Sequence, residues 1–292
     1  MGTIRIATRA SAQARTQAER VAARLAEAGH DTELVFIETH GDRTQGEGVP
    51  LHSIGGQGVF VKEVQRAVLD GRADAAVHSA KDLPTDSTTG LRIAAFTERR
   101  TAADALVGRS LVELPSGATV ATGSVRRRAQ LRRARPDLEF VELRGNIHTR
   151  LERIPDGGSI VMAVAALEIL GLTDRIAERL DTAEFVPAVG QGCVAVECRD
   201  GDDRVEDALQ RIDHELTRRE VLIERAFLAE LGSGCSLPVG AYVDGPKLYA
   251  FLAEETSGIT VSETIDLPGP LDRDLELARH TARAAHAHVI GG

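Results

Sequence analysis

The chain has 292 residues, 42% hydrophobic and 27% charged, which is typical of a globular protein with two or three domains rather than a disordered one. The net charge of −9 disfavours nucleic acid as the usual partner. Because no apolar run reaches membrane-spanning length and the N-terminus has charges where a signal peptide needs apolar residues, we expect a cytoplasmic protein with no membrane partner and no disulfide framework.

The first hundred residues alternate between strand-like and helix-like patterns. IRIATR alternates as a strand does, Ser11 is placed to cap the next helix, and Gly29 is placed to end it. The polar, Gly-rich stretch HGDRTQGEGVPLHSIGGQG predicts a long loop. This rhythm implies a mainly parallel sheet with helices on its faces. We predict strands at residues 4–9, 33–39 and 73–79, and helices at 12–28 and 59–71.

The same rhythm restarts near residue 118. Strand patterns (ATVAT, LEFVEL, SIVMA) alternate with helix patterns up to PAVGQG, which predicts a return crossing into the strand CVAVEC. A long helical stretch follows from about Asp203, and the C-terminal part is rich in strands and ends in a helix. The predicted fold is therefore two α/β lobes with mixed, mainly parallel sheets and a small α+β C-terminal domain. The predicted boundaries are 1–96 with 191–210 for the first lobe, 97–190 for the second, and 211–292 for the C-terminal domain.

Arginine is concentrated in one segment of this acidic protein. Only three of the 35 basic residues are lysines, and nine arginines lie between residues 126 and 153. Three of them, 126–128, follow Ser124 in the first turn of a predicted helix, where the helix dipole makes each cation unfavourable by about 0.3–1 kcal/mol. The arginines could simply pair with neighbouring carboxylates on a solvated face. Because Arg144 also follows a strand, with Arg150 one turn onward, we favour an anion site at the carboxyl ends of these strands.

A second polar cluster belongs to the first lobe. Arg9 and Ser11 lie at a strand-to-helix turn, and Lys81 and Asp82 follow another predicted strand. Lys81 and Asp82 could form a plain ion pair in a Pro-bounded turn. If both face a cleft, Asp82 is the one obvious carboxylate among many cations, able to accept N–H hydrogen bonds or to stabilise a developing positive charge.

The three cysteines have different settings. Cys193 and Cys198 alternate with apolar residues in CVAVEC, which predicts buried thiols. Cys235 lies between glycines in GSGCSLPVG, where its sulfur is approachable, so it is either an inert loop thiol or a nucleophile or covalent attachment point. The histidines and cysteines show no zinc-ligand spacing, and we predict no metal site.

Seven stretches together resemble the porphobilinogen deaminases, also called hydroxymethylbilane synthases. They occur in the family's order from Arg5 to Gly240, and HSAKDLP with the cysteine loop is the most specific pair. The stretches are RIATRAS, GGQGVFVKE, HSAKDLP, TGSVRRRAQL, LRGNIHTRL, PAVGQG and GSGCSLPVG.

The resemblance implies a cytoplasmic, monomeric transferase with two lobes similar to periplasmic binding proteins. Such an enzyme adds four porphobilinogen units to a dipyrromethane cofactor with loss of ammonia, and then releases the linear tetrapyrrole hydroxymethylbilane. Cys235 would carry the cofactor through a thioether, and Asp82 would bind pyrrole N–H groups and stabilise the cationic azafulvene. The resemblance assigns the cofactor's carboxylates to Lys81, Thr122, Ser124, Arg126, Arg127 and Arg150, and the substrate to Arg9, Ser11, Arg144 and Phe60.

Two other functions compete with this reading. A non-enzymatic, two-lobed polycarboxylate-binding protein explains the arginines but gives Cys235 no task. A nucleic-acid binder is disfavoured by the net charge and by an aromatic content of only 3%. Gln57 and His40, in the loop that would act as a lid, differ from the residues that the family usually has there. We expect these differences to affect the electrostatics of the loop and the turnover rate rather than the chemistry.

Overall fold

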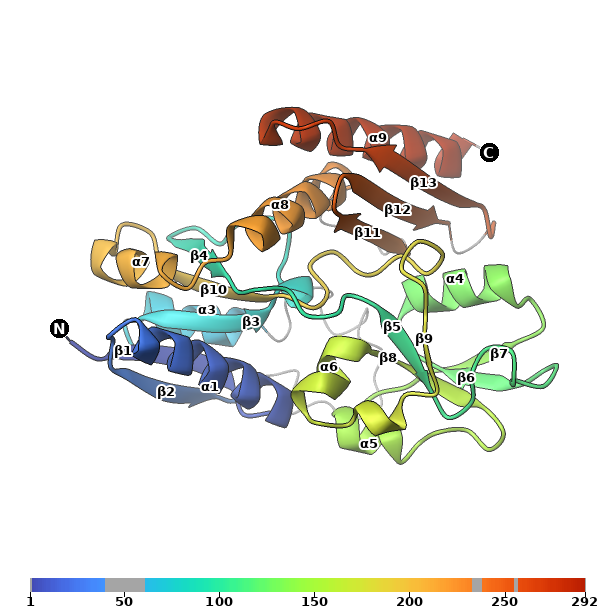
Figure 1. Cartoon of the computed structure of the whole chain (residues 1–292), viewed down its shortest axis with the longest axis horizontal. Coiled ribbons are helices and arrows are strands. Elements are labelled where there is room, and N and C mark those ends of the chain that lie inside the picture. Colours follow the sequence, from blue (N-terminus) through green and yellow to red (C-terminus); the bar gives the residue numbers. More distant parts are fainter. Residues whose placement is uncertain (1, 40–60, 233–237, 255–256, 292) are drawn as a thin grey trace. The chain divides into compact units, whose positions relative to one another are not determined.

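The computed structural model describes residues 2–39, 61–232, 238–254 and 257–291 (Figure 1). The chain divides into two compact units, one made of residues 1–100 and 193–218 and the other of residues 101–192 and 219–292. Across the described ranges, none of the helices combines the length and the apolar character that crossing a membrane would require.

The first unit is built on a five-stranded sheet with the order β2-β1-β3-β10-β4. Strands β2, β1 and β3 are parallel, whereas β10 is antiparallel to both of its neighbours, so four of the five strands run in the same direction. This confirms the expected mixed, mainly parallel sheet. The strands are β1 (Ile4–Arg9), β2 (Thr32–Ile37), β3 (Ala75–Ser79), β4 (Leu91–Phe96) and β10 (Val194–Arg199).

Helices cover both faces of this sheet because successive strand residues point to opposite sides. Ile6 packs in one core with residues of α1 and α7, and Ala7 packs in a second core with residues of α3. Helix α1 begins after Ser11 and ends just before Gly29, whose φ of +86° suits glycine, as the sequence predicted. The helices are α1 (Ala12–Glu27), α3 (Lys62–Leu69) and α7 (Asp203–Gln210), and a 3₁₀ turn (Ala80–Asp82) follows β3.

The second unit repeats this sheet arrangement with the order β7-β6-β8-β5-β9. Strand β6 is parallel to β7 and β8, and β5 is antiparallel to β8 and β9. The strands are β5 (Asp104–Val107), β6 (Thr119–Ala121), β7 (Glu139–Val141), β8 (Ser159–Ala163) and β9 (Glu178–Arg179). The helices are α4 (Val125–Ala134), α5 (Ile147–Leu151) and α6 (Val164–Ile169), followed by a 3₁₀ turn (Thr173–Arg175).

The C-terminal part of this unit is a small α+β structure with its own core. Its antiparallel sheet has the order β11-β12-β13, with β11 (Val239–Asp244), β12 (Lys247–Ala253) and β13 (Thr260–Asp266). Helices α8 (Glu215–Glu230) and α9 (Leu271–Gly291) contribute Phe227 and Ala282 to the core, where they meet Ala241 of β11 and Leu248 of β12. The predicted strand-rich C-terminal region that ends in a helix is confirmed.

Candidate active site

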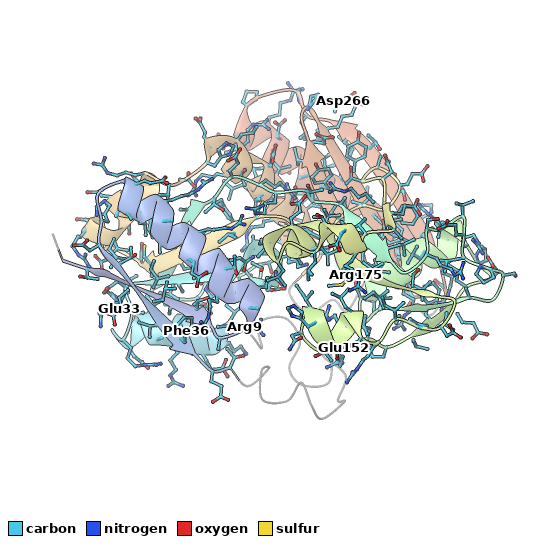
Figure 2. The ribbon with its side chains drawn as sticks, turned by 60° about the horizontal axis from the view of Figure 1, so that its bottom comes forward. Arg9, Glu33, Phe36, Glu152, Arg175 and Asp266 are labelled. Carbon is cyan, nitrogen blue, oxygen red and sulfur yellow. The ribbon has the colours of Figure 1, made fainter. Side chains whose placement is uncertain are left out.

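A pocket lies where β1 and β3 end in the first unit. Because these strands are parallel, Arg9 at the end of β1 and the 3₁₀ turn after β3 lie at the same edge of the sheet. The pocket has a volume of about 410 Å³, part of it open to solvent, and Arg9, Ser11 and Asp82 line it. Figure 2 shows Arg9 close to the start of α1. The structure thus brings the turn of Arg9 and Ser11 together with the turn of Asp82, which are far apart in the sequence, and Lys81 lies in the same turn as Asp82.

Hydrogen bonds fix the walls of this pocket. The Ser11 hydroxyl caps α1 by accepting from the Ala14 amide at 3.4 Å. The amide group of Gln17 on α1 reaches the Ser79 hydroxyl at the end of β3, with its nitrogen at 3.0 Å and its oxygen at 3.2 Å. Both Gln17 and Ser79 line the pocket. Helix α1 and strand β3 are therefore joined directly at the pocket.

A buried polar group behind the pocket was not found from the sequence. His78 of β3, also a pocket residue, lies with its Nε2 3.0 Å from Oε2 of Glu197 on β10. Gln65 of α3 donates to both carboxylate oxygens of Glu197, at 2.9 and 3.1 Å. The available signal was the presence of His78 in the mostly apolar stretch AAVHSA and of Glu197 in CVAVEC, which shows that each needs a polar partner but not which one.

In the second unit, hydrogen bonds and a tightly packed glycine fix the turn from β6 into α4. Ser124 caps α4 by accepting from the Arg127 amide at 3.4 Å, and its own amide donates to the Thr122 hydroxyl at 3.2 Å. Between them, Gly123 is required because a Cβ atom there would lie 2.8 Å from the carboxylate of Glu142 and 2.9 Å from the carbonyl of Leu143. Thr122 and Ser124 are therefore fixed at the carboxyl end of β6.

Two of the predicted cofactor-binding arginines surround an internal carboxylate. Asp104 of β5 is 1% exposed, and its oxygens accept from Arg126 at 2.7 Å, from Arg127 at 2.6 Å and from Gln191 at 2.8 Å. Arg126 and Arg127 each also donate to one backbone carbonyl, that of Val186 and that of Val161. Burial acts to raise the pKa of the Asp104 carboxyl, but the charges of Arg126 and Arg127 outweigh it and hold that pKa below its ordinary value.

Other arginines of the segment pair with nearby acceptors. Arg128 and Arg144 lie 3.4 and 3.3 Å from the Glu142 carboxylate, and Arg135 lies 2.8 Å from that of Asp137. Arg150 donates from Nε to the Gly145 carbonyl at 2.8 Å. The simpler interpretation, arginines pairing with neighbouring carboxylates, therefore holds for part of this segment. Arg144 and Arg150 still lie after β7, at the sheet edge that β6 and β7 share.

The remaining predicted residues have separate outcomes. Cys235, Phe60 and the predicted lid loop, with Gln57 and His40, lie outside the described residues. Cys193 and Cys198 are buried, as predicted, and burial raises the pKa of the Cys198 thiol to about 12. Among the residues that the structure describes, histidine, cysteine, aspartate and glutamate form no group that could hold a metal ion.

Comparison with known proteins identifies the family. Residues 4–207 match the family model described as "Porphobilinogen deaminase, dipyromethane cofactor binding domain", and residues 218–264 match "Porphobilinogen deaminase, C-terminal domain". The porphobilinogen deaminase of Xanthomonas oryzae pv. oryzae (strain PXO99A) is 43% identical over 97% of this chain and 95% of its own length. That of Xanthomonas campestris pv. campestris (strain B100) is 47% identical over 85% of this chain and 84% of its own length.

Among solved structures, the methionine binding protein MetQ aligns with 74% of this chain and 92% of its own, with a TM-score of 0.47 and 15% identity. The first family model alone spans more than half of the chain, and the curated relatives extend the match to almost its whole length. The chain belongs to the porphobilinogen deaminase family.

Proposed function

We propose that Asp82 is the catalytic carboxylate of this enzyme and that Cys235 anchors its dipyrromethane cofactor through a thioether bond. Family membership gives the activity: the chain is a transferase of tetrapyrrole biosynthesis that joins four porphobilinogen molecules with loss of ammonia and releases hydroxymethylbilane. It does not favour the alternative of a non-enzymatic polycarboxylate-binding protein. When bound, dipyrromethane supplies the pyrrole carbon to which the first porphobilinogen is joined.

The proposal extends to the organisation of the protein. The enzyme works as a cytoplasmic monomer whose small-molecule partner is porphobilinogen. Its functional domains are residues 1–96 with 191–210, residues 97–190, and residues 211–292. The family comparison supports this division in one respect, because the cofactor-binding and C-terminal family models match separate parts of the chain.

The donors of this chain fit a cofactor that carries several carboxylates. Arg126 and Arg127 together exceed the charge of Asp104 by one positive charge, and each guanidinium has five N–H groups, of which the described bonds use two. The N-terminus of α4 adds backbone N–H groups and a partial positive charge. In this proposal Lys81, Thr122, Ser124, Arg126, Arg127 and Arg150 hold the cofactor's carboxylates, and Arg9, Ser11, Arg144 and Phe60 hold the substrate.

The observation that carries the role of Asp82 is its place in the pocket. Among the described residues that line the pocket, Asp82 is the one carboxylate, and it lies there with Arg9 and Ser11. Arg9 and the Ser11 hydroxyl can bind a substrate carboxylate, because a guanidinium and a hydroxyl both donate to it. The Asp82 carboxylate can accept a pyrrole N–H and stabilise the positive charge that develops as ammonia leaves.

Substitution of Asp82 tests this role. Asp82→Ala is expected to fold and to lose roughly 10²–10⁴-fold in kcat, the range for losing a positioned catalytic group. Asp82→Glu keeps the charge but displaces it, and it is expected to lose most of the turnover as well. Asp86→Ala changes an exposed carboxylate on the same connection and is the matched control, which should keep its turnover. Near-normal turnover of Asp82→Ala would remove Asp82 from the mechanism.

Substitution of Cys235 tests the anchor independently. The purified wild-type protein is expected to react with Ehrlich's reagent and to show an intact mass above that of the bare chain by one dipyrromethane. Cys235→Ser should show the bare mass and no colour, whereas Cys198→Ala, which changes a buried thiol, should keep both signals. A Cys235→Ser protein that still carries the cofactor would refute the assignment.

A further inference from the structure

Three polar side chains are buried together behind the pocket that contains Asp82. Gln65 is 4% exposed, His78 6% and Glu197 3%, and they come from three elements, α3, β3 and β10. Burying a carboxylate is costly unless its partners compensate for the lost water. Apolar side chains of similar volume would fill such a space at lower cost, so the group needs a reason other than packing.

The register of the sheet explains how the three side chains meet. Glu197 pairs with Ala76 across the antiparallel β3–β10 ladder, and Ala76 and His78 share a face because they are two residues apart. That face is the one that α3 covers, since Ala76 packs in the same core as residues of α3. Glu197 and His78 are therefore diagonal neighbours beneath α3, with Nε2 of His78 3.0 Å from Oε2 of Glu197.

The orientation of Gln65 is fixed as well. Its amide oxygen accepts from the Thr88 hydroxyl at 3.0 Å, so its nitrogen is left facing Glu197. From there it donates to both carboxylate oxygens, at 2.9 and 3.1 Å. Thr88 lies just before β4, and the chain of contacts therefore runs from this loop through α3 and β10 to the end of β3.

The end of β3 is also the start of the turn that carries Asp82. His78 lines the same pocket as Asp82, which follows four residues later. The first residue of the turn, Ala80, donates from its amide to the Cys193 carbonyl at 3.0 Å, just before β10. The end of β3 is thus joined to β10 by a backbone hydrogen bond, and beside it the His78 imidazole lies 3.0 Å from the Glu197 carboxylate, a close contact without hydrogen-bond geometry.

We propose that His78, packed against the Glu197 carboxylate that Gln65 orients, is a positioning residue that sets the place of Asp82 in the pocket. The inference rests on the proposed catalytic role of Asp82. Glu197 packs against the imidazole at the pocket wall, and the imidazole in turn fixes the end of β3, from which the turn that contains Asp82 continues. A displacement of about 1 Å at a catalytic group can cost 10²-fold in rate, so loss of this support should appear in kcat.

The main test replaces Glu197 by Gln, which has nearly the same shape but no charge. Its N–H₂ group would face the Gln65 amide nitrogen, which is itself a donor. We expect Glu197→Gln to fold, to carry the cofactor by intact mass, and to lose about 10–100-fold in kcat, the range seen when a supporting partner of a functional group is removed. The KM for porphobilinogen should stay within about twofold, because the residues proposed to bind substrate are unchanged.

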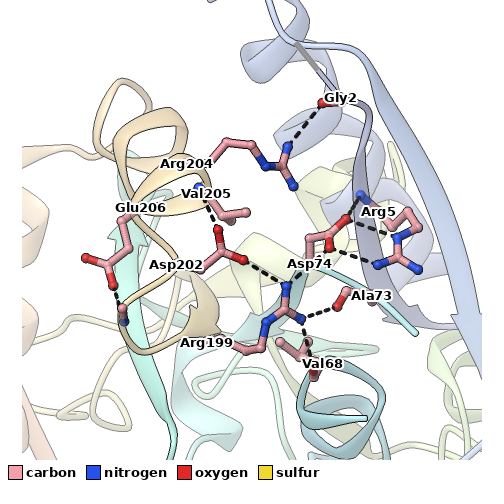
Figure 3. A network of polar contacts seen from close by, with 11 residues as sticks. Gly2, Arg5, Val68, Ala73, Asp74, Arg199, Asp202, Arg204, Val205 and Glu206 are labelled. Carbon is pink, nitrogen blue, oxygen red and sulfur yellow. Dashed lines mark hydrogen bonds and ion pairs between the residues drawn. The ribbon is translucent and has the colours of Figure 1, made fainter. Parts of the chain in front are cut away.

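Two further variants separate positioning from general destabilisation. His78→Gln is expected to lose a similar factor in kcat, and the double variant should lose no more than the worse single variant, because the two residues act as one unit. Asp74→Asn is the matched control: Asp74 is also buried in the first unit, at the opposite end of β3, where it pairs with Arg5 and Arg199 (Figure 3). It should lose stability and keep its kcat.

The outcomes distinguish this inference from the proposed role of Asp82. If Asp82→Ala is inactive while folded Glu197→Gln and His78→Gln keep kcat within about twofold of wild type, the positioning role is wrong and the role of Asp82 stands. If Asp74→Asn lowers kcat as much as Glu197→Gln, the effect is one of stability, and the inference is overturned. If Glu197→Gln does not fold, the His78→Gln protein decides by the same criterion.

Discussion

The buried carboxylate of Asp104 offers the sharpest test of the second unit. In Asp104→Asn the shape is kept and the charge is lost. The wild-type carboxylate accepts three hydrogen bonds, from Arg126, Arg127 and Gln191. An Asn side chain has one acceptor oxygen, and its N–H₂ group would face a guanidinium that also donates. Two buried cations would then lack their counter-charge.

The expected loss is large because both partners stay behind. Removing one member of a buried ion pair costs about 3–5 kcal/mol, since the remaining charge is uncompensated. The side chains of Arg126 and Arg127 are 6% and 10% exposed, so water can offset little of this. By contrast, Arg135 and Asp137 form a pair whose side chains are 25% and 34% exposed, and water and salt screen such a surface pair so that it adds little to stability.

Urea unfolding followed by circular dichroism measures the difference. Asp104→Asn should lower the free energy of unfolding by about 3–5 kcal/mol, visible as a lower midpoint at an unchanged m-value. Asp137→Asn, the surface control, should leave the midpoint nearly unchanged, because solvent screens its pair with Arg135. A folded Asp104→Asn protein that loses no more than this control would show that the two arginines do not depend on Asp104, and the reasoning would fail.

Three further predictions concern stability. Burial raises the pKa of Asp74, but hydrogen bonds and the charge of Arg5 outweigh it and lower that pKa from 3.8 to about 2. A carboxyl whose pKa is lowered by folding stabilises the protein at pH values above its pKa in the unfolded chain. Wild type should therefore lose about 1–2 kcal/mol of unfolding free energy between about pH 4 and pH 2, a value reduced because the Arg5 side chain is 39% exposed. Urea unfolding at several pH values should show this loss in wild type and not in Asp74→Asn. Ser124→Ala removes the cap of α4 and should cost about 1 kcal/mol of unfolding free energy. Gly158→Ala places a Cβ atom 2.0 Å from the Thr119 carbonyl and should lower the unfolding midpoint by an amount equivalent to about 1–3 kcal/mol, as is usual for overpacking.

The elements with clear local signals could be predicted from the sequence. Helix α1 lies where Ser11 and Gly29 placed it, and β1 has the bounds of its alternating pattern. Strands β4 and β5 were not predicted. Strand β5, DALV, is four residues long and buried throughout, so it lacks the alternation that a half-exposed strand shows. The residues of β10 and β5 also do not indicate that these strands run antiparallel to their neighbours, because strand direction depends on the connections that lead into each sheet.

In the candidate site, too, some features could be predicted from local sequence patterns and others could not. Arg9 and Ser11 lie at the end of β1 and Asp82 follows β3, and parallel strands bring such residues to one edge, so their meeting at a pocket follows from the topology. The partners of Asp104 and Glu197 could not be predicted in this way. Each is a single acidic residue in an apolar strand, and its partners come from distant elements that only the packed fold brings into contact. Long-range polar pairing leaves no periodic pattern in the chain.

In the proposed function the arginine segment has two tasks, to pair with Asp104 and to bind the cofactor's carboxylates, and the charge balance explains how one segment could perform both. A single cation would be fully neutralised by Asp104 and would offer nothing to a ligand. Two adjacent arginines at the start of α4 hold Asp104 between them and keep one net positive charge, next to backbone N–H groups that also favour anions. Asp104 thereby offsets the repulsion between the two guanidinium groups and fixes their direction, and one of the two positive charges remains uncompensated. The internal carboxylate of Asp104 is therefore, in charge terms, what allows two cations to be placed beside one another.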